Sequence, residues 1–125
     1  MGYVSHKSEE SVEDYLETIY ILSQRLPAVR SVDIATELGY SKPSVSVAMK
    51  NLRNREFITV SEEGYISLTT DGKALATRTF ERHTVLANWL VSLGVDPQTA
   101  SVDACKVEHD ISQETFDALK KHILG

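Results

Sequence analysis

The sequence has one cysteine, three prolines and six glycines, and it contains no long hydrophobic run. Cys105 alone cannot form an intramolecular disulfide, and no apolar segment approaches the roughly 20 residues that cross a membrane. The N-terminus lacks the hydrophobic region of a secretory signal. These absences favour a cytoplasmic protein with no membrane partner. A length of 125 residues excludes a large multidomain enzyme but allows a buried core.

Basic residues are outnumbered by acidic ones, 13 to 18, which gives a net charge of −5. An acidic chain is at first sight a poor nucleic-acid binder, because contact with phosphates needs Lys and Arg. The charge is unevenly distributed, however. Residues 21–60 carry six basic side chains against three acidic ones, whereas both ends of the chain are acidic. A local basic face can therefore meet phosphates while the rest of the molecule stays negative.

The N-terminal region has the 3.6-residue apolar period of an amphipathic helix. Ser11 is its expected N-cap, and Asp14 completes a capping-box-like pattern three residues later. This helix should end near Leu26 and Pro27.

Two short helical segments follow, separated by turn residues. The first runs from Ser31 to Leu38 and is closed by Gly39, a residue suited to the left-handed C-terminal position. The second has Ser41 as its N-cap and Pro43 in its first turn. The pattern predicts a helix, a four-residue turn and a second helix.

Two β-prone runs follow the helix-turn-helix and predict a small β-wing. Phe57–Val60 and Tyr65–Leu68 are joined by four residues ending in Gly64, which can take the positive φ that a hairpin needs. The rest of the chain predicts three further helices. They are expected from Thr69 or Thr70 to Gly94, from Asp96 to about His109, and from Ser112 through Ile123.

The second helix of a helix-turn-helix enters the major groove with its N-terminal residues at the base edges. No Arg, Asn or Gln stands at those positions, so bidentate base readout is missing. Small hydroxyls, and contacts with thymine methyls, predict modest direct specificity that DNA shape and dimer spacing supplement. A purely structural pair of helices is the alternative. The candidate DNA-binding residues are Arg30, Ser31, Ser41, Lys42, Pro43, Ser44, Ser46, Val47 and Lys50.

A second constellation consists of side chains that can bind a metal. Cys105, Glu108 and His109 have i, i+3 and i+4 spacing, so a helix projects all three from one face. Asp14 and Glu17 repeat the i, i+3 spacing on the first expected helix. This spacing is typical of chelating pairs.

His83 lies in the middle of the long expected helix, near its apolar stripe. If this helix and the two that carry the other five residues packed together, six candidate ligands would converge. Only a cation makes that favourable, because three carboxylates otherwise repel and are costly to bury. Each residue also has an ordinary explanation: His83 as a core histidine, Cys105 as a small buried hydrophobe, Asp14 as a carboxylate facing the helix dipole. The candidate metal ligands are Asp14, Glu17, His83, Cys105, Glu108 and His109.

Five segments of the chain are similar to the diphtheria-toxin-repressor family of metal-dependent transcriptional repressors. The likeness covers nearly the whole chain, and the six candidate ligands match the ligand positions of that family. The short length resembles its manganese-transport-regulator branch. The similar segments are Ser11–Tyr20, Ser41–Ser46, Leu68–Lys73, Arg82–His83 and Cys105–His109.

This resemblance implies a mainly α fold, with an N-terminal winged helix-turn-helix domain over residues 1–70 followed by a helical metal-binding and dimerisation domain over residues 71–125. It also implies a homodimer that uses Mn²⁺ or Fe²⁺ as corepressor, binds a palindromic double-stranded DNA operator and controls metal uptake genes. The bound metal is expected to hold the two recognition helices at the spacing of successive major grooves, about 34–36 Å.

The sequence departs from the family at several positions. Manganese-type members resemble it at Asp14 but carry Glu where Cys105 stands, and iron-type members resemble it at Cys105 but carry Met where Asp14 stands. Oxygen ligands suit Mn²⁺, whereas a thiolate shifts preference toward Fe²⁺, Co²⁺, Ni²⁺ or Zn²⁺. Ala87 and Ser101 replace a carboxylate and a histidine, so a second metal is not implied. Val47 replaces a Gln used against bases by some iron-type members.

Three other functions remain open on the sequence. A metal-independent winged-helix regulator could sense oxidants through Cys105. A hydrolytic metalloenzyme could use the same ligands, although no separate nucleophile or general base is evident. A structural metal site in an interaction module would leave the chain unfolded when stripped of metal.

The hybrid ligand set gives a testable expectation. Cys105→Glu should strengthen the response to Mn²⁺ relative to Fe²⁺ and Zn²⁺, because it replaces a soft ligand with a hard one. Anaerobic fluorescence-anisotropy titrations of promoter DNA with each metal measure this ranking. An unchanged ranking would contradict the role given to the thiolate.

Overall fold

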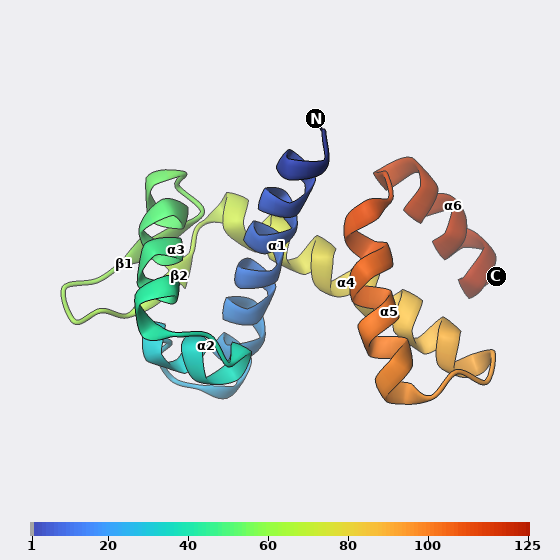
Figure 1. Ribbon diagram of the computed structural model, residues 1–125, viewed down its shortest axis with the longest axis horizontal. Helices are drawn as coiled ribbons and strands as arrows, with labels where there is room; N and C mark the ends of the chain where they lie inside the picture. Colours follow the sequence, from blue (N-terminus) through green and yellow to red (C-terminus); the bar gives the residue numbers. More distant parts are fainter. Residues whose placement is uncertain (1) are drawn as a thin grey trace. The chain divides into compact units, whose positions relative to one another are not determined.

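The computed structural model describes residues 2–125, with side chains described from Ser11 onward. This part of the chain forms six helices and one two-stranded sheet, which confirms the mainly α fold class (Figure 1). None of its helices combines the length and hydropathy that a bilayer crossing requires. The elements are α1 (Gly2–Arg25), α2 (Ser31–Leu38), α3 (Lys42–Asn54), β1 (Ile58–Val60), β2 (Ile66–Leu68), α4 (Thr70–Ser92), α5 (Pro97–Asp110) and α6 (Gln113–Leu124).

The chain divides into two compact units within α4. Ser8–Thr77 form the N-terminal unit, and Arg78–Gly125 lie in the C-terminal one. In the N-terminal unit, side chains from α1, α2, α3, the start of α4 and both strands share one hydrophobic core. Because burial of apolar surface is the main driving force for folding, this core holds α2 and α3 in place. Its most deeply buried members include Leu16, Ile19, Ile34, Val45, Leu52 and Ile58.

The predicted helix-turn-helix is confirmed by α2 and α3. Gly39 closes α2 with φ 70°, and its N–H donates to the carbonyl of Ala35 at 2.9 Å. Ser41 caps α3 by accepting a hydrogen bond from the N–H of Ser44 at 3.3 Å. Three residues separate the helices, rather than the predicted four, because Lys42 already belongs to α3.

The predicted wing is an antiparallel hairpin. Ile58 pairs with Leu68 and Val60 with Ile66, and the turn places Gly64 at φ 86°. The N–H of Ile66 also donates to the carbonyl of Val29 at 2.7 Å, so the wing is attached to the loop before α2. The first strand begins one residue later than predicted, because the N–H of Phe57 still bonds to the α3 carbonyl of Leu52.

The prediction that Ser11 caps the first helix was wrong. Helix α1 begins at Gly2, so Ser11 lies inside it and the capping box with Asp14 does not form. Residues 3–10 contain neither Gly nor Pro, and nothing in their backbone chemistry stops a helix. The predicted C-terminal end near Leu26 is confirmed, since α1 ends at Arg25.

The three C-terminal helices begin at predicted caps. Of the two candidates for α4, Thr69 is the cap, and its hydroxyl accepts from the N–H of Gly72 at 3.1 Å. Asp96 caps α5 and Ser112 caps α6. In the C-terminal unit, Leu86, Ala104 and Phe116 form the buried core that joins the three helices.

Gly72 provides a test of how the wing joins α4. A Cβ at this position would lie 2.0 Å from the carbonyl oxygen of Phe57. That oxygen also accepts from the N–H of Thr69 at 3.0 Å, so it cannot move freely. Gly72→Ala should therefore lower the free energy of unfolding by about 1–3 kcal/mol. Thermal unfolding measures the change against Thr70→Ala, an exposed control in the same turn. Equal melting temperatures would contradict the expected clash.

Candidate metal centre and nucleic-acid interface

Glu108 lies at the centre of a cluster of metal-capable side chains in the C-terminal unit. Its carboxylate is completely buried. Oxygen Oε2 lies 3.0 Å from Nδ1 of His83 on α4, and Oε1 lies 3.4 Å from Nε2 of His109 on the same helix. The side chain of His109 is 1% exposed and that of His83 is 27% exposed. The structure thus brings together two candidate ligands, His83 and Glu108, that stand 25 residues apart in the sequence.

Cys105 adds a sulfur atom to this cluster. One ligand atom each from Cys105, Glu108 and His109 lies within 4.8 Å of the others. This closeness follows from the i, i+3 and i+4 spacing on α5 that the sequence predicted. A carboxylate, imidazoles and a thiol are the ligand types that a divalent transition metal accepts, so the residues present fit such an ion.

The burial of Glu108 has an energetic consequence. Moving an ionised carboxylate out of water costs several kcal/mol unless a positive charge and hydrogen bonds compensate for it. Groups that can supply that charge here include the imidazoles of His83 and His109 when protonated, and a cation held by the same atoms. The cluster is therefore suited to exchange protons for a metal ion.

Ser101 lies on the other side of the His83 ring. Its hydroxyl is 3.3 Å from Nε2, while Nδ1 faces Glu108. Outer partners of this kind fix the orientation of a metal-binding imidazole. The contact of Ser101 with His83 was not predicted from the sequence, where Ser101 stands out only as a residue that replaces a histidine of the family.

Arg82 is a further residue that sequence reasoning missed. Its guanidinium is buried and donates to the backbone carbonyls of Glu108, at 2.7 Å, and Ile111, at 3.0 Å. It also donates to the side chain of Gln113 at 3.0 Å and lies 5.3 Å from the centre of the Phe116 ring. In the sequence it stands out only as part of the Arg82–His83 segment that resembles the family. Its contacts leave no pattern of residue types, because the acceptors are mainly backbone carbonyls.

The other two candidate ligands belong to the N-terminal unit. Asp14 and Glu17 are half-buried and stand about one turn apart on α1. The backbone carbonyl of Asp14 accepts a hydrogen bond from the hydroxyl of Thr18 at 2.8 Å. Both carboxylates therefore have the helical spacing that the sequence predicted.

The start of α3 presents most of the candidate DNA-binding residues to solvent. Val45, Met49 and Leu52 turn toward the core, and the opposite side of the helix is exposed. Val47 is 62% exposed on this side of the helix, so its methyl groups are accessible to a partner. The exposed candidates are Ser41, Lys42, Pro43, Ser44, Ser46, Val47 and Lys50.

Arg30 and Ser31 lie at the beginning of α2. Ser31 is half-buried, whereas Arg30 is exposed and in contact with the wing. Its guanidinium donates to the Tyr65 hydroxyl at 3.1 Å and lies 4.8 Å from the ring centre. This contact holds a positive charge between the helix-turn-helix and the wing. No residue pattern indicates Tyr65 as the partner of Arg30, because the two residues are 35 positions apart.

Tyr15 on α1 packs against Tyr40 in the turn between α2 and α3. Their ring centres are 6.1 Å apart in an edge-to-face arrangement. Burial, and then the neighbouring Tyr40, raise the pKa of Tyr15 above its usual value of 10.0. The Tyr15 hydroxyl therefore stays uncharged through the physiological pH range.

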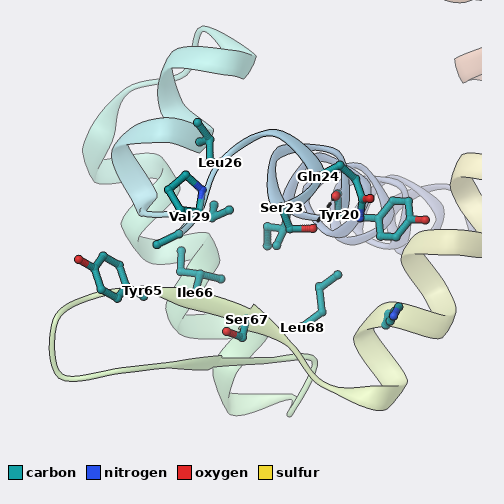
Figure 2. Close-up of a pocket in the computed structure, with 13 residues that line it drawn as sticks. Tyr20, Ser23, Gln24, Leu26, Val29, Tyr65, Ile66, Ser67 and Leu68 are labelled. Carbon is teal, nitrogen blue, oxygen red and sulfur yellow. Dashed lines mark hydrogen bonds between the residues drawn. The ribbon is translucent and has the colours of Figure 1, made fainter.

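A hollow of about 430 Å³ lies between α1 and the wing. Figure 2 shows Tyr20 and Ser23 of α1 on one side, with Ile66 and Leu68 of β2 on the other. Its lining includes Lys73 but no carboxylate, histidine or cysteine. It therefore has no set of ligands for a metal and no carboxylate or imidazole for acid–base chemistry.

Two family models together match nearly all of the chain. Residues 7–66 match the model described as iron dependent repressor, N-terminal DNA binding domain. Residues 69–124 match the model described as iron dependent repressor, metal binding and dimerisation domain.

Individual proteins that are similar to this chain are also described as regulators. The transcriptional regulator MntR of Salmonella typhimurium is 40% identical over 109 residues, which cover 87% of this chain and 69% of that protein. Among solved structures, the metal-dependent transcriptional regulator MtsR matches with a TM-score of 0.83 and 26% identity. The manganese regulator SloR matches with a TM-score of 0.80 and 27% identity. Each structural match covers 90% of this chain and 53% of the other, so the chain spans about half the length of these two structures.

Glu108 can be tested directly by thermal unfolding. A ligand that binds only the folded state stabilises it by about 2.7 kcal/mol at 100 times its Kd. Saturating Mn²⁺ should therefore raise the melting temperature of the native sequence, and Glu108→Gln should remove most of that rise. Glu114→Gln is the matched control, because Glu114 is exposed in the first turn of α6. An equal rise in Glu108→Gln would exclude the buried carboxylate as a ligand.

Proposed function

The chain belongs to the family of iron-dependent repressors, and from this premise we propose that it represses transcription at an operator when Mn²⁺ or Fe²⁺ is bound. The members it matches are transcriptional regulators and not enzymes. The comparisons give no support to the alternative in which Cys105 senses oxidants. The protein's partners are DNA and a second copy of the chain.

The buried cluster in the C-terminal unit is the observation that carries this proposal. His83, Cys105, Glu108 and His109 supply two imidazoles, a thiol and a carboxylate. When bound, a divalent cation supplies the positive charge that compensates the buried carboxylate. The imidazoles must then be neutral and the thiol ionised, so binding is expected to release protons.

Asp14 and Glu17 complete the proposed ligand set from α1. Their half-buried position, their i, i+3 spacing and the resemblance to the family support this role. The six ligands then come from both units of the chain. Residues that share one ion restrict the arrangement of the segments that carry them, which couples metal occupancy to DNA affinity.

We propose that the two functions, DNA binding and metal-dependent dimerisation, belong to successive parts of the chain. Residues 1–70 bind DNA, and residues 71–125 bind metal and form the homodimer.

The exposed start of α3 enters the major groove, with Ser44, Ser46 and Val47 at the base edges and Lys42 and Lys50 at phosphates. Arg30 and Ser31 contact DNA from the start of α2. A two-fold dimer of such units reads a palindromic operator, with half-sites about one helical turn apart. The proposed location is the cytoplasm.

The metal dependence of DNA binding tests this function. Fluorescence anisotropy at fixed salt should show tighter binding to a promoter fragment with saturating Mn²⁺ or Fe²⁺ than with chelator. A coupling of about 1–3 kcal/mol corresponds to a 5–150-fold change in affinity. Glu108→Gln should abolish the difference and leave the weak binding in chelator intact, whereas Glu114→Gln should retain it. Equal affinities of the native sequence with metal and with chelator would contradict the proposed function.

A further inference from the structure

Arg82 connects the two helices that carry the clustered ligands of the C-terminal unit. It stands on α4 directly before His83, and its Nη1 donates to the backbone carbonyl of Glu108 on α5 at 2.7 Å. The same nitrogen donates to the carbonyl of Ile111 at 3.0 Å. The Arg82 side chain thus joins the backbone of α4 next to His83 to the backbone of Glu108 on α5.

The position of these acceptors explains why an arginine is suited to this place. The last carbonyls of a helix have no partner within the helix and carry partial negative charge. Glu108 lies in the last turn of α5, and Ile111 is its C-cap. A planar guanidinium can bind both carbonyls and also reach Gln113, at the start of α6, through its second terminal nitrogen. Phe116 covers the guanidinium at 5.3 Å and helps to exclude water.

The geometry points to Arg82 as a positioning residue for the metal centre, an inference that rests on the proposed function. Arg82 fixes the backbone of Glu108 relative to α4, so that Oε2 of the carboxylate meets Nδ1 of His83 at 3.0 Å. Without the guanidinium, the end of α5 is free to shift relative to α4. Glu108 and His83 then lose their common orientation, although every ligand is still present in the chain.

A surface ion pair in the same unit provides the matched control. Lys120 on α6 contacts Glu81 on α4 at 2.9 Å, with both side chains substantially exposed. This pair also connects two helices, and Glu81 directly precedes Arg82, but the contact joins two side chains and does not involve the backbone of Glu108. Because exposed ion pairs contribute little to stability, Lys120→Met should leave the metal centre unchanged.

Titration with Co²⁺ under anaerobic conditions tests this role. The absorption spectrum reports the geometry of the bound ion, and its thiolate band reports the participation of Cys105. Arg82→Met should weaken Co²⁺ binding about 10–100-fold, as loss of an outer partner typically does. Its spectrum should also differ from that of the native sequence at saturation. Arg82→Lys keeps the charge but not the planar fork, so it should restore only part of the affinity.

The outcomes separate this role from general stabilisation. Circular dichroism of the metal-free variants establishes whether each one folds. If Arg82→Met does not fold, Gln113→Leu removes one acceptor of the guanidinium and should produce a smaller change of the same direction in affinity and spectrum. If Arg82→Met folds and keeps the native Co²⁺ affinity and spectrum, the positioning role of Arg82 is wrong but the proposed function stands. If Arg82→Met does not fold, native affinity and spectrum in Gln113→Leu lead to the same conclusion. Absence of Co²⁺ and Mn²⁺ binding by the native sequence would instead overturn the proposed function.

Discussion

The burial of the Glu108 carboxylate is the constraint on which the rest of the C-terminal unit depends. A negative charge that is 0% exposed requires compensation, and the structure places His83 and His109 at 3.0 and 3.4 Å from its two oxygens. Such an arrangement is not needed for stability, because a well-packed apolar residue at the same place would stabilise the fold as well or better. It is suited to a site where protons and a divalent cation compete for the same atoms, and such a site is the physical basis of the metal dependence that we propose.

The N-terminal unit resolves the apparent conflict between an acidic chain and DNA binding. The side of α3 that faces away from the core carries exposed hydroxyls, the exposed Val47 and a few basic groups. Arg30 is held against Tyr65, which gives the wing a positive charge at a fixed place. Recognition of this kind depends on fit and DNA shape more than on bidentate base contacts. The net charge of −5 alone would have argued against DNA binding.

Much of the fold could be predicted from the sequence, because its signals are local. Gly39, Ser41, Asp96 and Ser112 determine helix ends through their own backbone and side-chain chemistry, and the structure confirms them. Ser11 was wrongly predicted as a cap, because a residue of capping type is also tolerated inside a helix when nothing before it stops the helix. The spacing of Cys105, Glu108 and His109 was predictable for the same local reason. The contacts of Arg82 with backbone carbonyls, and of Arg30 with a tyrosine 35 residues away, depend on tertiary packing and leave no sequence pattern.

A crystal structure of the protein grown with Mn²⁺, with anomalous diffraction recorded at the manganese absorption edge, would test the central claim most directly. The account predicts one strong anomalous peak bonded to Glu108, with His83, Cys105 and His109 around it and carboxylate oxygens of Asp14 or Glu17 completing the coordination. A peak at any other place, or a Glu108 carboxylate that is not bonded to the ion at saturating metal, would contradict it.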